Sequence, residues 1–249
     1  MSNGVDVVAE VQCQDWQHFR ETVYANDNGN NGPVYRGVAD SGWRLLTSLD
    51  RLFGHLNETE RSAVAVKAAE LFRGEAERYG VDIPSDAREA LSVGQHLGLP
   101  TRLLDWTLSP YVAAFFAFSS YCMRKRTDRQ PDDEVAVWAL QIDQEMCLNG
   151  SDVAHSPIEM VRARPHINSR LYAQMGMFTV NNTGKPFLET LKDWGKTHLL
   201  KQLIIPASEA EVALRDLRLM RIDDATMFPD LSGAVRGIIS SFLIESTHK

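Results

Sequence analysis

Cysteine is scarce in this 249-residue chain, and long hydrophobic runs are absent from it. The three cysteines, Cys13, Cys122 and Cys147, are odd in number and widely spaced, so they predict neither a disulfide framework nor a paired metal site. No window approaches the length of a membrane span, and the N-terminus lacks the basic-then-apolar pattern of a signal peptide. These absences predict a protein of the reducing cytoplasm that does not contact a membrane.

A surplus of positive charge is also missing, since the formal net charge is −7 and the isoelectric point is about 5.5. This balance argues against a protein held on nucleic acid by bulk electrostatics, although it is compatible with a local basic groove. No cluster of carboxylates or histidines has metal-ligand spacing, which predicts no metal site and makes a metal-dependent nuclease a weak hypothesis. Repeats, a coiled coil and a long linker are absent too.

Hydrophobic periodicity predicts helices early and late in the chain. Their ranges are 57–80, 85–98, 109–123, 208–220 and 231–245. Most predicted strands fall in the second half, at 134–142, 172–181 and 198–206. With 44% hydrophobic residues the chain can bury one large core. This order of elements predicts an α+β fold rather than a doubly wound parallel sheet.

The letters Phe-Arg-Gly occur at residues 72–74, and a variant with Tyr occurs at residues 35–37. Arg73 lies inside a predicted helix, beside its apolar stripe and within reach of acidic neighbours, as expected for a solvated helix face. Arg36 lies in a predicted strand, next to a glycine that lets another group approach the backbone closely. Arg36 is therefore the better candidate for a functional arginine.

Polar groups are concentrated between residues 94 and 107, among leucines, a proline and a tryptophan. A buried strand at 101–107 obliges its polar side chains to find partners. Taken singly, each residue has a structural explanation: Arg102 and Asp105 as an ion pair, His96 as a hydrogen-bonded core histidine. Taken together they suggest a site. The group consists of Gln95, His96, Arg102, Asp105 and Thr107.

A second candidate site lies at residues 166–182. If 172–181 is a regular strand, Tyr172, Gln174 and Phe178 share one face with Gly176. Gln174 would then offer its amide to a polar ligand. In the structural alternative, the two aromatic rings pack in the core and Gln174 bonds a backbone edge.

Several of these segments together resemble the FRG-domain family, which is named after a Phe/Tyr-Arg-Gly motif. The matching stretches are VYRG, WRLLTSLDR, GQHLGLPTRLLDWTLSPYVAAFFAF, RLYAQMGMF and ATMFPDLSG. They run in the family's order through residues 34–235, with Tyr35 in place of Phe and Leu97 where an aromatic residue is common. The resemblance implies a single domain over 1–249, with a lead-in at 1–33 and the end of a C-terminal helix at 236–249.

The order of the motifs is also similar to that of ADP-ribosyltransferases, which bind NAD in a split α+β sheet. In those enzymes one strand holds the cofactor with an Arg or His. A second, polar strand leads into a helix of small and aromatic residues, and a third strand supplies a Glu. The resemblance implies a split, mostly antiparallel sheet with helices packed around it, and NAD as a substrate. It implies NAD contacts from Tyr35, Arg36, Gly37, Arg102, Thr107 and Phe116.

The same resemblance implies catalytic roles. Gln174 stands in place of the glutamate and can bond a ribose hydroxyl, but an amide cannot act as a general base. Asp105 is the first candidate for that base and His96 the second. The implied activity is transfer of ADP-ribose to a macromolecular acceptor, RNA or DNA among the candidates. The implied setting is a toxin or a phage-defence system, in which a neutralising antitoxin would be a partner.

The alternative of a different class is a non-catalytic module that binds a nucleotide or a protein. In that case the polar cluster is a structural network. The enzyme hypothesis requires Arg36, Thr107 and Gln174 to converge on one cleft.

Overall fold

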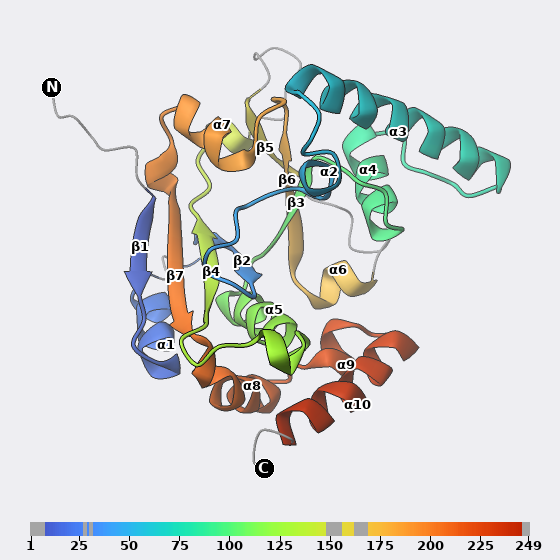
Figure 1. The fold of residues 1–249 in the computed structure, drawn as a ribbon. Coiled ribbons are helices and arrows are strands. Elements are labelled where there is room, and N and C mark those ends of the chain that lie inside the picture. The colour runs from blue at the N-terminus through green and yellow to red at the C-terminus, as the bar shows by residue number, and fades with distance from the viewer. Residues whose placement is uncertain (1–7, 27–28, 30–31, 148–155, 162–168, 246–249) are drawn as a thin grey trace, which may run out of the picture.

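A seven-stranded sheet runs through the middle of the molecule (Figure 1). The computed structural model describes residues 8–26, 29, 32–147, 156–161 and 169–245. In this part of the chain the strand order is β1-β7-β4-β2-β3-β6-β5, with β1 parallel to β7 and the other recorded pairs antiparallel. The strands are β1 (Ala9–Gln12), β2 (Val34–Val38), β3 (Leu103–Thr107), β4 (Glu134–Leu140), β5 (Ile158–Val161), β6 (Gly176–Asn181) and β7 (Leu200–Pro206).

Helices cover both faces of this sheet, and one long helix, α3, projects away from it (Figure 1). The helices are α1 (Trp16–Ala25), α2 (Ser48–Leu52), α3 (Glu58–Arg78), α4 (Ala87–His96), α5 (Pro110–Cys122), α6 (Ser169–Ala173), α7 (Phe187–Asp193), α8 (Ala210–Leu219), α9 (Asp224–Met227) and α10 (Leu231–Glu245). The predicted α+β class and the mostly antiparallel sheet are confirmed. Parts of the predicted chain ends, 1–7 and 246–249, lie outside the described residues.

Strand β4, in the interior of the sheet, shows how the sheet separates two cores. Side chains on a strand alternate between its faces, and β4 is buried on both. Val135 and Val137 pack in a core formed with α1, α5 and α8. Ala136 and Trp138 pack in a second core on the opposite face, where α7 contributes Phe187.

Side-chain caps set the starts of the helices. Asn57 and Glu60 form a reciprocal capping box at the start of α3. Asp86 accepts two backbone N–H bonds at the start of α4. Ser109 caps α5 with a proline at the first helical position. These caps explain why the predicted helices at 57–80, 85–98 and 109–123 are confirmed to within a few residues.

β2 and β3 are joined far less completely than their neighbours in the sheet. Tyr35 with Thr107 is the single pair recorded between them in the described residues. By contrast, all five residues of β2 pair with β4, and all five residues of β3 pair with β6. The two parts of the sheet, β1-β7-β4-β2 and β3-β6-β5, therefore diverge beyond Tyr35.

Gly37 lets helix α5 lie directly against strand β2. A Cβ atom on Gly37 would sit 1.9 Å from the carbonyl oxygen of Ala113 and 2.8 Å from the backbone nitrogen of Ala117. Real Cβ contacts are never this short, so no larger residue fits without moving the helix. The close approach that the sequence predicts at Gly37 is thus made by α5.

The predicted strand at 172–181 is wrong in its first half. Residues 169–173 form α6, whose backbone continues with a bond from the Gln174 N–H to the Arg170 carbonyl at 2.9 Å. Met175 then turns the chain with a φ of 47°, and β6 begins at Gly176. Tyr172 and Gln174 consequently share no strand face with Phe178. The apparent alternation in this segment is a helical turn followed by a strand.

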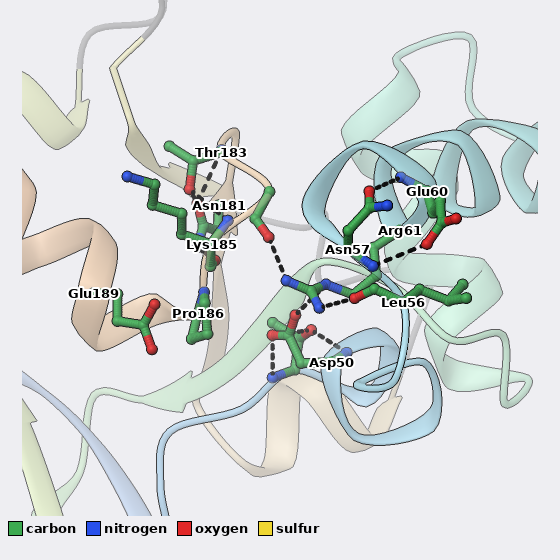
Figure 2. A network of polar contacts seen from close by, with 12 residues as sticks. Asp50, Leu56, Asn57, Glu60, Arg61, Asn181, Thr183, Lys185, Pro186 and Glu189 are labelled. Atoms are coloured by element: carbon green, nitrogen blue, oxygen red, sulfur yellow. Dashed lines mark hydrogen bonds and ion pairs between the residues drawn. The ribbon is translucent and has the colours of Figure 1, made fainter.

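A polar network fixes the start of the projecting helix α3 (Figure 2). Nη1 of Arg61 donates to the Leu56 carbonyl at 2.6 Å, and its Nη2 donates to the Gly184 carbonyl at 2.8 Å. The Arg61 Nε atom lies 3.8 Å from an oxygen of Asp50, which itself closes the capping box of α2 with Thr47. One arginine therefore ties α3 both to α2 and to the loop that follows β6.

Candidate functional site

A cleft of about 460 Å³ opens where β2 and β3 diverge, and we call it the main cleft. Residues of β2, β3, α4, α5, the α6–β6 segment and the loop after α9 line it. Its volume falls within the roughly 300–1,000 Å³ of small-molecule sites. Eight of the nine predicted site residues line the main cleft: Tyr35, Arg36, Gly37, His96, Asp105, Thr107, Phe116 and Gln174.

Arg36 spans the gap between the diverging strands. Its Nη1 donates to the main-chain oxygen of Asp105 at 2.9 Å and lies 3.4 Å from the carboxylate Oδ2. Burial lowers the pKa of Arg36, and the Asp105 carboxylate opposes that shift. The guanidinium carries further donors on Nε and Nη2. Arg36 thus joins β2 to β3 through Asp105, and its remaining N–H donors suit an anionic group.

Asp105 is the exposed residue of an otherwise buried strand. Its side chain is 58% exposed, whereas the other four residues of β3 are buried. Its Oδ1 accepts a hydrogen bond from Nε2 of Gln95 at 2.6 Å, and the Gln95 Oε1 accepts one from the Thr101 hydroxyl. Gln95 therefore orients the Asp105 carboxylate and joins α4 to β3. Gln95 and Asp105 thus form a structural network and a wall of the main cleft at once.

Thr107 and Gln174 both line the main cleft, and both already have partners. The Thr107 hydroxyl donates to the Gln174 main-chain oxygen at 2.7 Å and accepts from the Ser109 N–H at 3.1 Å. The side-chain Nε2 of Gln174 donates to the Met227 carbonyl at 3.0 Å. A ligand of the Thr107 hydroxyl would have to share or replace these bonds, whereas the Gln174 amide has a second N–H and an acceptor oxygen beyond the bond to Met227. Thr107 in particular holds the turn that carries Gln174.

The wall opposite β2 comes from the loop between α9 and α10. The Phe228 ring packs edge-to-face on Phe116 with centroids 5.9 Å apart. Arg170 lies over the same ring and donates through Nε and Nη2 to one carboxylate oxygen of Asp230, at 2.8 and 2.5 Å. Gly233 permits this loop, because a Cβ there would sit 1.9 Å from the Phe228 carbonyl oxygen. The C-terminal part of the chain thus completes the cleft.

His96 and Tyr35 flank the cleft in different ways. His96 is the last residue of α4 and is exposed to solvent. Tyr35 is buried in the core and forms part of the cleft wall through its position on β2. The expectation of a buried core histidine is wrong for His96, because the helix ends there at the surface.

Arg102, the ninth predicted residue, lies outside the main cleft. It lines a small cavity beside Asp50 and Arg61, where its Nη2 is buried without a hydrogen-bond partner among the described residues. Burial lowers its pKa, and Asp50 counteracts that shift. The expected pair with Asp105 is also wrong, since Asp105 pairs with Arg36. Positions three apart on an extended strand project to opposite faces, which separates the two side chains.

The described part of the chain has neither a cluster of metal-binding side chains nor a membrane-spanning helix. No group of three or more His, Cys, Asp or Glu side chains is placed there to hold a metal ion. No helix among the described residues is long and apolar enough to cross a bilayer.

Residues 31–126 match the FRG domain, so the family resemblance is confirmed over this stretch, which includes β2, β3 and helices α2 to α5. The predicted extent of 34–235 reaches further than the match, and the region after residue 126 stays a prediction. No curated protein and no solved structure matches the chain.

Several residues that line the main cleft are missing from the predicted site. They are Ser92, Ser120, Arg170 and Phe228, together with the apolar residues around them; Gln95, which the sequence places in the polar group without a role, lines the cleft as well. Gln95, Arg170 and Phe228 belong to motif stretches that carry the family resemblance, which is the signal that identifies them. The two serines lie on helices with no local pattern to distinguish them.

Proposed function

We propose that the protein is an ADP-ribosyltransferase that moves ADP-ribose from NAD to a macromolecular acceptor. One observation carries the proposal: Arg36, Asp105 and Gln174, from three separate segments of the chain, line the same cleft. The cleft also has an apolar side formed by Ala113 and Phe116 on α5, as a flat aromatic group such as nicotinamide requires.

The residues present suit NAD in charge and shape. Arg36 offers guanidinium donors to a phosphate, and Phe116 offers a ring face or edge to the nicotinamide. Bound NAD would supply a ribose C1′ whose bond to nicotinamide breaks, with the electron pair leaving on the nicotinamide nitrogen as an acceptor nucleophile bonds to C1′.

We assign Asp105 as the general base that accepts the proton of the acceptor nucleophile. It is exposed in the cleft, Gln95 and Arg36 hold its two oxygens, and a carboxylate can accept a proton from an attacking nucleophile. His96 is the second candidate because it lines the same cleft. Gln174 would bond a ribose hydroxyl through its amide oxygen or its second N–H, with the other N–H held by the Met227 carbonyl.

RNA or DNA is the acceptor class we propose, in a toxin or phage-defence role in the cytoplasm with a neutralising antitoxin as partner. This part of the proposal depends on the resemblance in motif order rather than on the cleft. The acidic net charge of −7 implies that any nucleic acid would be held locally and not by the whole surface.

A radiolabel transfer assay tests the proposal. The purified protein is incubated with NAD labelled in the adenylate, separately with RNA, DNA and cell lysate. Label should enter one of these acceptors with the wild type, and Arg36→Ala should reduce transfer at least about a hundredfold, as expected when a buried charged contact to the substrate is lost.

Arg44→Ala is the matched control, because Arg44 pairs with Glu189 at the surface, outside the main cleft. It should transfer label like the wild type. Absence of transfer, together with absence of a thermal shift on adding NAD, would contradict the proposal. Capture of a partner that survives both Arg36→Ala and Gln174→Ala would instead favour the non-catalytic binding module.

A further inference from the structure

A second hollow of about 160 Å³ adjoins the main cleft. The two share Arg36, Gln95 and Asp105 in their linings, so these three residues stand between them. A ligand lying against Arg36 would therefore have to pass over or displace the Arg36–Asp105–Gln95 contacts to reach from one hollow into the other.

The second hollow has the lining of a site for a flat ring. Leu46 and Leu99 are half-buried there, and the buried residues Leu103 and Leu104 lie behind them. Arg51 adds a guanidinium, which is held in place by donation from its Nη1 to the Leu46 carbonyl at 2.7 Å. Apolar walls and a planar cation are what a heterocyclic base binds against.

The charges around the second hollow favour an anion at its junction with the main cleft. Its lining contains two arginines, Arg36 and Arg51, and one carboxylate, Asp105. Burial lowers the pKa of Arg36 most strongly. The like charge of Arg51 lowers it further, and the carboxylate of Asp105 raises it. The surplus positive charge at this point would be stabilised by a phosphate.

We propose that the second hollow binds the adenosine half of NAD, with the pyrophosphate at Arg36 and the nicotinamide half in the main cleft. This inference rests on the proposed function, because it assigns a place to the second half of that substrate. Arg51, the last residue of the WRLLTSLDR stretch, becomes an adenosine-contacting residue.

The test compares two ligands on two variants by isothermal titration. NAD carries adenosine, whereas nicotinamide mononucleotide lacks it. Arg51→Ala should weaken NAD binding roughly tenfold and nicotinamide mononucleotide binding much less, because that ligand loses only the charge of Arg51 near its phosphate and no adenosine contact. Arg44→Ala removes the same charge from an exposed pair outside both hollows, and it should change neither.

A second variant, Leu46→Trp, fills the hollow instead of removing its charge. It should also weaken NAD selectively, with the melting temperature recorded to show that the protein is folded. Equal losses for both ligands, or no loss for NAD in either variant, would overturn the second hollow as the adenosine site. The same holds if Arg51→Ala retains NAD affinity and loses only transfer to RNA, since the hollow would then belong to the acceptor. If the wild type binds no NAD, the proposed function itself fails.

Discussion

Gly37 has a steric role that can be measured without any ligand. The Gly37→Ala substitution places a methyl group 1.9 Å from the Ala113 carbonyl oxygen, so α5 must move away from β2. We expect the free energy of unfolding to fall by about 3 kcal/mol or more. Urea denaturation followed by circular dichroism measures this loss.

Gly74 provides the matched control for that substitution. It lies in the middle of α3, and nothing is found within 4 Å of the Cβ that alanine would add. Gly74→Ala should therefore raise the free energy of unfolding by about 0.5–1 kcal/mol, because alanine favours the helix. A Gly37→Ala protein as stable as the wild type would show that α5 does not lie against β2.

The three cysteines differ in environment, and thiol labelling should separate them. Burial raises the pKa of Cys13 and of Cys122, which leaves less of the reactive thiolate at pH 8. Cys147 is exposed. In the native protein, iodoacetamide should modify Cys147 at least about tenfold faster than the other two, as read by peptide mass spectrometry.

Denaturant is the control for this labelling. In urea the three rates should converge, because the burial that distinguishes them is lost. A native rate for Cys122 equal to that of Cys147 would contradict the position of α5 in the core.

At the residue scale, the sequence predicted the cleft better than it predicted contacts. The sequence identifies Arg36 because it lies in a strand beside a glycine, and Asp105 because it is a polar group in a buried strand. Their mutual contact was missed, because it depends on β2 and β3 diverging. Arg102 was wrongly assigned to the NAD site. It belongs to the same motif as Asp105, but its side chain lies beside Asp50 in a separate cavity.

Among the elements, α3 depends on one residue near its start. Arg61→Ala removes the donors to two carbonyl groups and the ion-pair partner of the largely buried Asp50, which keeps only its charge interaction with Arg102. We expect a loss of about 2–3 kcal/mol in the free energy of unfolding. Thermal or urea unfolding of the variant beside the wild type gives the value.

Arg78 lies in the same helix and serves as the comparison. Its partner is Glu75, three residues away, and its side chain is 68% exposed. Arg78→Ala should change stability by less than about 0.5 kcal/mol. Equal losses for Arg61→Ala and Arg78→Ala would argue against an anchoring role for the network in Figure 2.

Helices proved more predictable than the short segments that complete the cleft. Hydrophobic periodicity is a local signal, and it placed α3 and α5 correctly; the caps Asn57 and Ser109 set their first residues in the structure. The α6–β6 segment has no such signal, because its turn depends on Met175 at positive φ and on Leu171 packing against Gly176. Both are tertiary effects that a periodicity count cannot detect.

For the whole molecule, the sheet predicts a gradient of hydrogen exchange. All seven residues of β4 pair with β7, and five of them also pair with β2. β1 and β5 are the end strands of the sheet in the described residues. Amides of β4 should therefore exchange most slowly and those of β1 and β5 faster, as measured by mass spectrometry. Equal protection across all the strands would contradict this topology.

The pairing of β1 with β7 has a consequence for the protein while it is being made. The paired residues Ala9 and Lys201 are 192 positions apart in the chain. At ordinary rates of translation, β1 leaves the ribosome about 10 to 40 s before its partner strand is synthesised. Over that interval β1 has no partner strand, because β7 does not yet exist. Nascent chains that stop before β7 should therefore be the ones that recruit chaperones or aggregate.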